Sequence, residues 1–335
     1  FGPVGWRRLG LDIDGEAAGD ESGISVSLSL DGMTVAIGAV YNDGTTVGNT
    51  SDQRGHVRIY QYANSTWTQL GQDIDGEAAN DRSGISVSLS DDGTIVAIGA
   101  YYNDGTTGNT SDNRGHVRVF QYDATKTTNV TDQNSSDFGP VGWRRLGQDI
   151  DGDAAADQFG QSVSLSYYNS RIRVAIGAPY NDENGSNSGH VRVFQYDENK
   201  TATITDKRSP YYGPSKWRRL YNDVYGLNTN DYFGVVVSIS ADGNRLAVSA
   251  NISSAANGYV QVYNISYDAT PPTSVCIHEH LYNDISGTLS TYFTDPSQLS
   301  YQVVPELLLT NTLHPSSLTI SQINNIYIRY RQSQL

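Results

Sequence analysis

The fold is decided by a unit that reads Phe159-Gly-Gln-Ser-Val-Ser-Leu-Ser166, then Val174-Ala-Ile-Gly-Ala-Pro179, then His190-Val-Arg-Val-Phe-Gln-Tyr196. Polar and apolar side chains alternate in the first and third stretches, which is the pattern of a strand with one buried face. The middle stretch is almost continuously apolar, and its side chains are small enough for close packing between sheets. Polar turns separate the three stretches, so the unit predicts an antiparallel β-sheet.

This unit recurs along the chain. Each copy is preceded by Trp-(Arg/Thr)-(Arg/Gln)-Leu, a short fourth strand that begins at Trp6, Trp67, Trp143 and Trp217. The copies are 61, 76 and 74 residues apart. Self-similarity on this scale predicts a repeat architecture, in which no unit buries its apolar face alone and each packs on its neighbours.

Four short antiparallel strands per repeat are typical of a blade of a β-propeller. We therefore predict an all-β chain: a β-propeller-like array of about four four-stranded antiparallel blades over residues 1–265. A linker at 266–275 and a small β-rich segment at 276–335, a β-sandwich or a divergent blade, are expected to follow. No helix longer than about ten residues is expected within 1–265, because no period of 3.6 residues is found there.

The motifs of the third copy identify a family. Phe159-Gly-x-Ser-Val, Ile176-Gly-Ala-Pro-Tyr-Asn-Asp182 and Gly189-His-Val-Arg-Val-Phe194 together resemble the FG-GAP repeat of integrin α-subunits and of many secreted algal and bacterial proteins. The resemblance implies that the Phe-Gly strand is innermost and the Trp strand outermost in each blade. It also implies an outer strand without its own blade at 6–9, and blades at about 22–70, 83–146, 159–220 and, in part, 233–263.

Charge and composition exclude several classes of partner. The chain has 22 basic and 36 acidic residues, a net charge of −14, which argues against nucleic acid or an anionic membrane as the main partner. No run approaches the ~20 apolar residues of a membrane span. A single cysteine, Cys276, rules out an internal disulfide framework and is expected to be a small core residue. Because residues 1–6 duplicate 138–143, the chain starts at a repeat junction, and we expect a piece of a longer protein.

Acceptor motifs for N-glycosylation point to an extracellular glycoprotein, secreted or on the cell surface. Nearly all lie in predicted loops, and the three at Asn49, Asn109 and Asn184 occupy equivalent loops. The Asn-x-Ser/Thr motifs begin at Asn49, Asn64, Asn109, Asn129, Asn134, Asn184, Asn199, Asn251 and Asn264.

An acidic loop ahead of each Phe-Gly strand has the spacing of a calcium loop, with acids at positions 1, 3, 5 and 9. Two features argue against calcium. The glycine of these loops is at position 4, whereas a calcium loop has it at position 6. The loops also precede the Phe-Gly strand, whereas the family's calcium loop follows that strand. The other interpretation is a turn between blades, whose aspartates bond to backbone amides. The candidate ligands are Asp12, Asp14, Glu16 and Asp20; Asp73, Asp75, Glu77 and Asp81; and Asp149, Asp151, Asp153 and Asp157.

Histidine and arginine recur as well. Because His56, His116 and His190 hold one strand position on different blades, we expect them to stack on neighbouring side chains rather than to share a metal. The pair His278-x-His280 has no evident third ligand. The arginine pairs after Trp6, Trp143 and Trp217 are expected to stack on tryptophan or to pair with the acidic loops.

No catalytic motif emerges, so the leading interpretation is a non-enzymatic extracellular structural or adhesion protein that contacts cell-surface proteins or glycans. Near-identical repeats and an unpaired strand at 6–9 also predict association with other copies, as a subunit of a fibre or surface appendage. Two alternatives remain: a secreted glycan-acting enzyme, with acids gathered in one pocket, and a lectin-like propeller with aromatic platforms. Calcium is the one cofactor that the sequence suggests.

Overall fold

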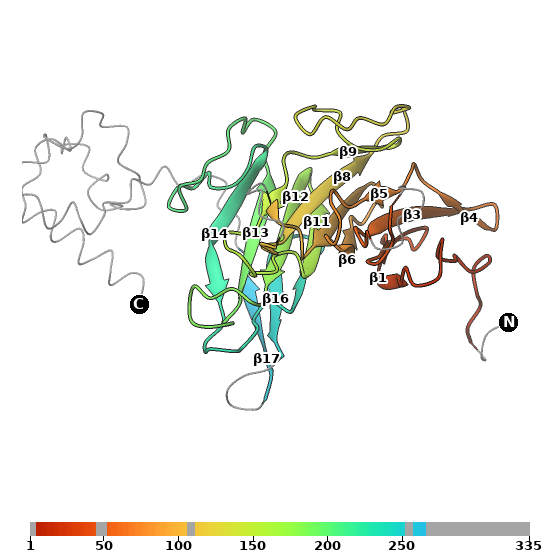
Figure 1. Ribbon diagram of the computed structural model, residues 1–335. Helices are drawn as coiled ribbons and strands as arrows, with labels where there is room; N and C mark the ends of the chain where they lie inside the picture. Colours follow the sequence, from red (N-terminus) through yellow and green to blue (C-terminus); the bar gives the residue numbers. More distant parts are fainter. Residues whose placement is uncertain (1–4, 45–51, 106–110, 252–256, 266–335) are drawn as a thin grey trace, which may run out of the picture. The chain divides into compact units, whose positions relative to one another are not determined.

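The structure is a computed structural model that describes residues 5–44, 52–105, 111–251 and 257–265 (Figure 1). The chain divides into two compact units, Phe1–Ser266 and Tyr267–Leu335, and the second lies outside the described residues. The predicted linker at 266–275 and segment at 276–335 therefore stay predictions. The elements of the described part are β-strands. No helix in the described part could cross a membrane.

The first two sheets correspond to the first two predicted blades. The first has the order β1-β2-β3-β4, with β5 also paired to β3, and the second has the order β10-β8-β7-β6, with β9 also paired to β8. The strands of the first sheet are β1 (Ser22–Leu28), β2 (Thr34–Ala39), β3 (His56–Ala63), β4 (Thr66–Gln69) and β5 (Ile74–Asp75). Those of the second are β6 (Ser83–Leu89), β7 (Ile95–Ala100), β8 (His116–Tyr122), β9 (Trp143–Arg145) and β10 (Ile150–Asp151).

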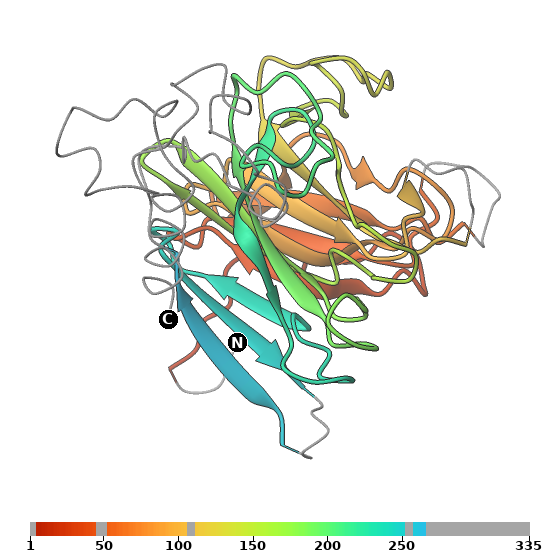
Figure 2. The ribbon, with the colours of Figure 1, turned by 90° about the vertical axis from the view of Figure 1, so that its left-hand side faces the viewer.

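The third and fourth sheets complete the array of the first unit (Figure 2). The third has the order β11-β12-β13-β14, with strands β11 (Ser162–Tyr168), β12 (Arg171–Ala178), β13 (His190–Tyr196) and β14 (Trp217–Tyr225). The fourth has three strands in the described residues, β15 (Val236–Ile239), β16 (Arg245–Ala250) and β17 (Tyr259–Asn264). The all-β, propeller-like arrangement of antiparallel sheets is therefore as predicted, and the Phe-Gly strands form one edge of each sheet.

Successive sheets share their hydrophobic cores. Val87 and Leu89 of β6 pack with Val57 and Ile59 of β3 in the preceding sheet. The same arrangement recurs between later sheets: Val163 and Leu165 with Val117 and Val119, and Val237 and Ile239 with Val191 and Val193. The apolar positions of the innermost strand thus face the sheet before, and the valines of the third strand face the sheet after.

The serines that alternate with these apolar residues bind the next sheet. Ser86 Oγ donates to the carbonyl of Gly160 (2.8 Å), and the amide of Leu165 donates to Ser88 Oγ (2.9 Å). Equivalent bonds join the other neighbours: Ser25 to Gly84, Leu89 to Ser27, Ser162 to Gly234 and Ile239 to Ser164. The alternation of Ser with Val or Leu therefore builds an interface on both sides of the strand.

A glycine on the second strand of each of the first three sheets allows the next sheet to come this close. A Cβ atom on Gly99 would lie 2.0 Å from the carbonyl oxygen of Gly160, so a side chain there would force the two sheets apart. The fourth sheet differs, because Ser249 of β16 stands where the first three sheets have glycine, and Val236 replaces the first serine. The glycine contact that joins the four sheets to one another is therefore not repeated on the far side of the fourth sheet.

The tryptophans that mark the repeats form a second link between sheets. Trp143 Nε1 donates to the carbonyl of Leu70 (2.9 Å) in the preceding Trp-x-x-Leu motif. Trp217 and Trp67 bond in the same way to Leu146 (2.7 Å) and Leu9 (2.9 Å).

The prediction of an outer strand at 6–9 is wrong. These residues have no strand partner among the described residues, and Trp6 is 78% exposed. A strand at this place would need the third strand of a preceding sheet to pair with, and the described residues offer none. Leu9 keeps only its carbonyl bond to Trp67.

Two tryptophans of the same motif give a matched test of this packing. Trp143 is fully buried, whereas Trp6 is exposed. We expect Trp143→Ala to lower the free energy of unfolding by about 3–5 kcal/mol, because it opens a cavity between sheets and removes a bond. Trp6→Ala should change it by less than about 0.5 kcal/mol. Urea denaturation of both variants measures this, and equal losses would contradict the packing.

Candidate functional site

Each acidic loop ends in an aspartate that fixes the loop to its sheet. In the second copy Asp81 Oδ2 accepts hydrogen bonds from the backbone amides of Glu77 (3.1 Å) and Ala78 (2.9 Å) and from Nδ2 of Asn103 (3.0 Å). The bond from an asparagine amide recurs at 2.9 Å in the first and third copies, from Asn42 to Asp20 and from Asn181 to Asp157. The position-9 acid is thus occupied by structural bonds, as the interpretation of a turn between blades predicts.

Burial makes several of these carboxyls harder to ionise. Burial raises the pKa of Asp157 to about 6, and it also raises the pKa of Asp81. At position 3, burial raises the pKa of Asp75 to about 6, with a further contribution from the charge of Asp73, and burial raises the pKa of Asp151 to about 6. The raised pKa values recur at positions 3 and 9 of the second and third loops, which indicates a packing role for these acids.

Positions 1 and 5 of the loops meet the recurring histidines. His56 Nδ1 lies 3.7 Å from Glu16 Oε2 and 3.9 Å from Asp73 Oδ2. In the second sheet His116 Nδ1 lies 3.8 Å from Glu77 Oε2. The groups whose three ligand atoms lie within 4.8 Å of one another in the described residues are Glu16, His56 and Asp73; Glu77, His116 and Asp149; and Glu183, His190 and Asp223.

These clusters correct one part of the sequence analysis. The three histidines lie on different sheets, as expected, and His190 packs edge-on against Phe159 and Tyr225 at centroid distances of 6.2 and 5.9 Å. His56 and His116 are nevertheless buried beside carboxylates from two acidic loops, and His190 is buried beside Glu183 and Asp223. The signal was present in the sequence, since histidine and loop recur together, but their distance along the chain hid the contact.

The third cluster is neutralised by protein cations. Arg192 Nε donates to Asp223 Oδ2 (2.8 Å), and the same guanidinium pairs with Asp153. Although burial acts to raise it, the bonds and charge of Arg192 hold the pKa of Asp153 well below its usual value. Lys207 pairs with both Asp153 (2.7 Å) and Glu183. The acids of this copy are therefore part of a buried salt-bridge network.

The arginines after tryptophan pair with the first acid of each loop, as predicted. The distances are 2.9 Å for Arg8–Asp12, 2.7 Å for Arg145–Asp149 and 2.9 Å for Arg219–Asp223. Asp14 contributes its backbone carbonyl, which accepts a bond from Arg58 (2.7 Å).

The structure does not gather the carboxylates of a single loop. In the described residues no three acids from one loop bring their oxygens within 4.8 Å of one another. Calcium binding by the acidic loops therefore stays a prediction without a preformed site.

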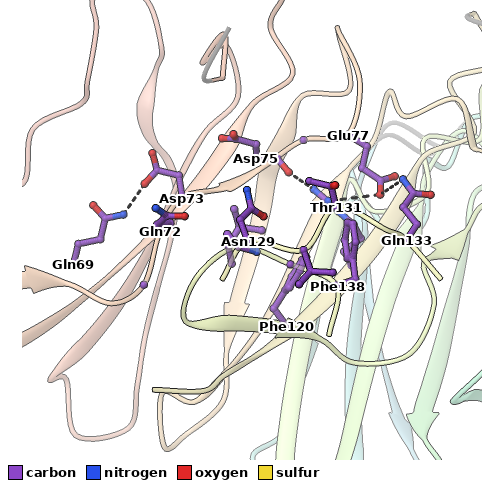
Figure 3. Close-up of a pocket in the computed structure, with 17 residues that line it drawn as sticks. Gln69, Gln72, Asp73, Asp75, Glu77, Phe120, Asn129, Thr131, Gln133 and Phe138 are labelled. Carbon is purple, nitrogen blue, oxygen red and sulfur yellow. Dashed lines mark hydrogen bonds and ion pairs between the residues drawn. The ribbon is translucent and has the colours of Figure 1, made fainter. Parts of the chain in front are cut away.

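A cavity of about 810 Å³ lies between the acidic loop of the first sheet and the connection from β8 to β9 (Figure 3). Gln69 donates to Asp73 (2.6 Å) on one wall, and Gln133 donates to Glu77 (3.0 Å) on the other. We call this space the inter-sheet cavity. Its lining is mixed. The polar residues are Gln69, Gln72, Asp73, Asp75, Glu77, Arg118, Asn129, Thr131 and Gln133, and the apolar residues include Ile74, Phe120, Val130, Phe138 and Pro140.

The repeats differ at two residues that line the inter-sheet cavity. Residues 126–143 and 200–217 align without a gap, so Gln133 corresponds to Lys207 and Phe138 to Tyr212. In the third sheet Lys207 reaches Asp153, and Tyr212 donates to the same carboxylate (2.6 Å). Sequence reasoning missed this site, although the exchange of Lys for Gln at aligned positions was a readable signal.

The cavity is acidic. Three carboxyl groups line it, from Asp73, Asp75 and Glu77, against the single guanidinium of Arg118. Burial acts against the ionised form of Glu77, but the charges of Arg118 and His116 lower the pKa of Glu77 overall. A site with this balance suits neutral or cationic ligands better than anionic ones.

The glycosylation motifs are accessible wherever the structure describes them. The asparagines at 64, 129, 134, 184, 199, 251 and 264 are exposed, and those at 49 and 109 lie outside the described residues. Asn129 lines the mouth of the inter-sheet cavity. Attachment of glycans to these positions stays a prediction.

His190 gives a test of the buried clusters by pH. Burial, and then the charge of Arg192, lowers the pKa of His190 to about 4, whereas the unfolded chain takes up the proton near pH 6.5. This contribution to stability is complete above pH 6.5 and is lost as the pH falls toward 4. Between about pH 7 and pH 4.5, wild type should lose about 2 kcal/mol more than His190→Phe. Urea unfolding at both values measures the difference, and parallel losses would contradict it.

Comparison with known proteins supports the repeat assignment. The model of the FG-GAP repeat matches residues 74–120 and 150–194, and a search of the curated proteins finds no significant match. Among solved structures, hydrazine synthase of Kuenenia stuttgartiensis is similar at 12% identity and a TM-score of 0.37, over 78% of this chain and 50% of that chain. The periplasmic gluconolactonase PpgL of Pseudomonas aeruginosa is similar at 14% identity and a TM-score of 0.30, over 75% and 74%.

The two matched segments coincide with structural repeats. Each begins at the short strand before an acidic loop, β5 or β10, and ends in the third strand of a sheet, β8 or β13. This chain spans half the length of the hydrazine synthase chain that it matches. The two segments, residues 74–120 and 150–194, therefore match the FG-GAP repeat.

Proposed function

We propose that the chain is a non-enzymatic extracellular recognition protein that binds a neutral or cationic glycan in the inter-sheet cavity. One observation carries the proposal: the inter-sheet cavity lies beside Gln133, where the third sheet has Lys207 paired with the acidic loop. Residues that recur in every copy serve the packing of the repeat, whereas a binding site is normally built once. Adhesion to cell surfaces through glycans is the biological role that this site would serve.

The chemistry of the lining supports a polyhydroxylated ligand. Side-chain amides of Gln69, Gln72 and Gln133 both donate and accept hydrogen bonds, as sugar hydroxyl groups do. The volume of about 810 Å³ lies in the range of small-molecule sites, roughly 300–1,000 Å³. Excess negative charge selects against sulfated and uronic-acid sugars.

An extracellular setting is supported by the sequons. All seven that the structure describes are exposed on loops, turns or strand ends, where an enzyme could modify them. Glycans at these positions would cover the outer surface of the array. The glycan at Asn129 would also lie beside the cavity mouth and limit the size of the ligand.

A hydrolase is the second candidate, and one observation favours it. Asp75 and Glu77 line the same cavity, and the pKa of Asp75 is raised to about 6 by burial while that of Glu77 is lowered. Two carboxyls with pKa values moved apart are suited to act as general acid and base. The raised pKa recurs at Asp151 in the next copy, however, which favours a packing role.

Association between copies stays a prediction. Val26 and Leu28 of β1 are 64% and 60% exposed, although their counterparts in later sheets are buried. At the junctions within the chain, the face that carries these apolar residues packs against a sheet with a glycine on its second strand and a serine on its first. The fourth sheet has Ser249 and Val236 at these two positions. A fibre would therefore need a contact of another kind.

The cavity is tested by copying the third repeat into the second. Gln133→Lys should fill the cavity and pair with Glu77, as Lys207 pairs with its carboxylates, and should weaken binding to immobilised neutral oligosaccharides at least about ten-fold. Lys207→Gln in the third sheet is the matched control: it leaves the inter-sheet cavity intact and should not weaken that binding.

Three results would contradict the proposal. The first is equal glycan binding by wild type and Gln133→Lys, and the second is binding to none of the oligosaccharides presented. The third is turnover of a bound oligosaccharide that Asp75→Asn abolishes, which would establish the hydrolase instead. Thermal unfolding of each variant confirms that the fold is kept.

A further inference from the structure

One of the three histidine clusters differs from the other two in its charge balance. We propose that Glu16, His56 and Asp73 form a binding site for a divalent transition-metal ion of the zinc type. The proposal is independent of glycan binding: only Asp73 is shared with the inter-sheet cavity, and Glu16 and His56 do not line it.

The first argument is the unpartnered imidazole nitrogen. The side chain of His56 is 1% exposed, and its Nδ1 atom has no hydrogen-bond partner among the described residues. It points between Glu16 Oε2 at 3.7 Å and Asp73 Oδ2 at 3.9 Å. These distances are too long for hydrogen bonds. They are close to the separation of two ligands that each lie about 2.0–2.2 Å from a shared zinc ion.

The second argument is the residue at position 69. In the second and third clusters an arginine neutralises the first acid of the loop, through Arg145 to Asp149 (2.7 Å) and Arg219 to Asp223 (2.9 Å). The first cluster has neutral Gln69 at this place, which donates to Asp73 Oδ1 (2.6 Å) and leaves Oδ2 toward the histidine. The first cluster therefore carries one protein cation fewer.

The remaining groups around the cluster leave room for an ion. Asn42 Nδ2 lies 3.4 Å from Glu16 Oε2, and Arg58 lies 3.9 Å from Glu16 Oε1, while its other nitrogen is bonded to the carbonyl of Asp14. The two carboxylates face one guanidinium. A divalent cation would balance this excess of negative charge, whereas in the third cluster Arg192 pairs with Asp223 and Lys207 pairs with Glu183.

The ligand set selects the class of metal. Imidazole nitrogen suits zinc, copper, iron and nickel, whereas calcium and magnesium take oxygen ligands. One nitrogen and two carboxylate oxygens match a zinc-type ion with a fourth position left for water. Entry is possible from the side of Glu16, whose side chain is 46% exposed.

The test is a calorimetric titration of the full chain with Zn²⁺ after dialysis against a chelator. Every protein carries His278→Gln and His280→Gln, so that this second histidine pair does not contribute. We expect one equivalent of zinc to bind, and His56→Gln to weaken it at least about ten-fold. Gln69→Arg, which installs the arginine of the other copies, should do the same. His116→Gln is the matched control and should leave binding unchanged.

Co²⁺ provides a second measurement, because its visible absorption reports nitrogen coordination directly and should vanish in His56→Gln. Zinc affinity that persists in His56→Gln, or that falls equally in His116→Gln, would overturn the assignment. So would Ca²⁺ that competes with Zn²⁺ at equal concentration, or the absence of zinc binding. Since Gln69→Arg introduces a residue that the repeat already accepts, loss of folding would not explain its effect.

Discussion

The array depends on close contact between the backbones of successive sheets, at a glycine on the second strand of one sheet and a glycine of the next. A Cβ atom on Gly177 would lie 1.9 Å from the carbonyl oxygen of Gly234, and the same closeness recurs at the two earlier junctions. Only at this separation can Ser162 Oγ reach the carbonyl of Gly234 (2.7 Å). The approach also buries the apolar residues of the innermost strand against the preceding sheet. Fold and stability therefore rest on residues that every internal junction repeats.

The two proposed sites lie at positions where the copies differ. Gln133 lines a cavity at the position where Lys207 pairs with the acidic loop in the next sheet, and Gln69 leaves a carboxylate unneutralised where the other copies have arginine. Both exchanges replace a cation with an amide beside the acidic loop of the first sheet. Because the scaffold is repeated, a single side chain is enough to convert a salt-bridged loop into a site. The glycan and metal proposals thus draw on one structural principle, and they share Asp73 and the neighbouring Gln69.

Much of the fold could be predicted because strand alternation and turn residues are local signals. The strand order and the edge position of the Phe-Gly strands followed from the pattern and the family resemblance. The strand at 6–9 was wrongly predicted, since its motif carries no information about whether a partner strand exists. The clusters around His56 and His190 were missed because their acids come from other loops, and only the packing of sheets brings them together.

The central claim is that the glycine contact sets the spacing of the sheets, and a pair of exchanges tests it most directly. Ser249 occupies the glycine position in the fourth sheet, where no further sheet packs in the described residues. The account predicts that Gly99→Ser lowers the free energy of unfolding by about 1–3 kcal/mol or more, because its Cβ meets the backbone of Gly160. Ser249→Gly should change it by less than about 1 kcal/mol. Equal and small changes in the two variants, measured by urea denaturation, would contradict the account.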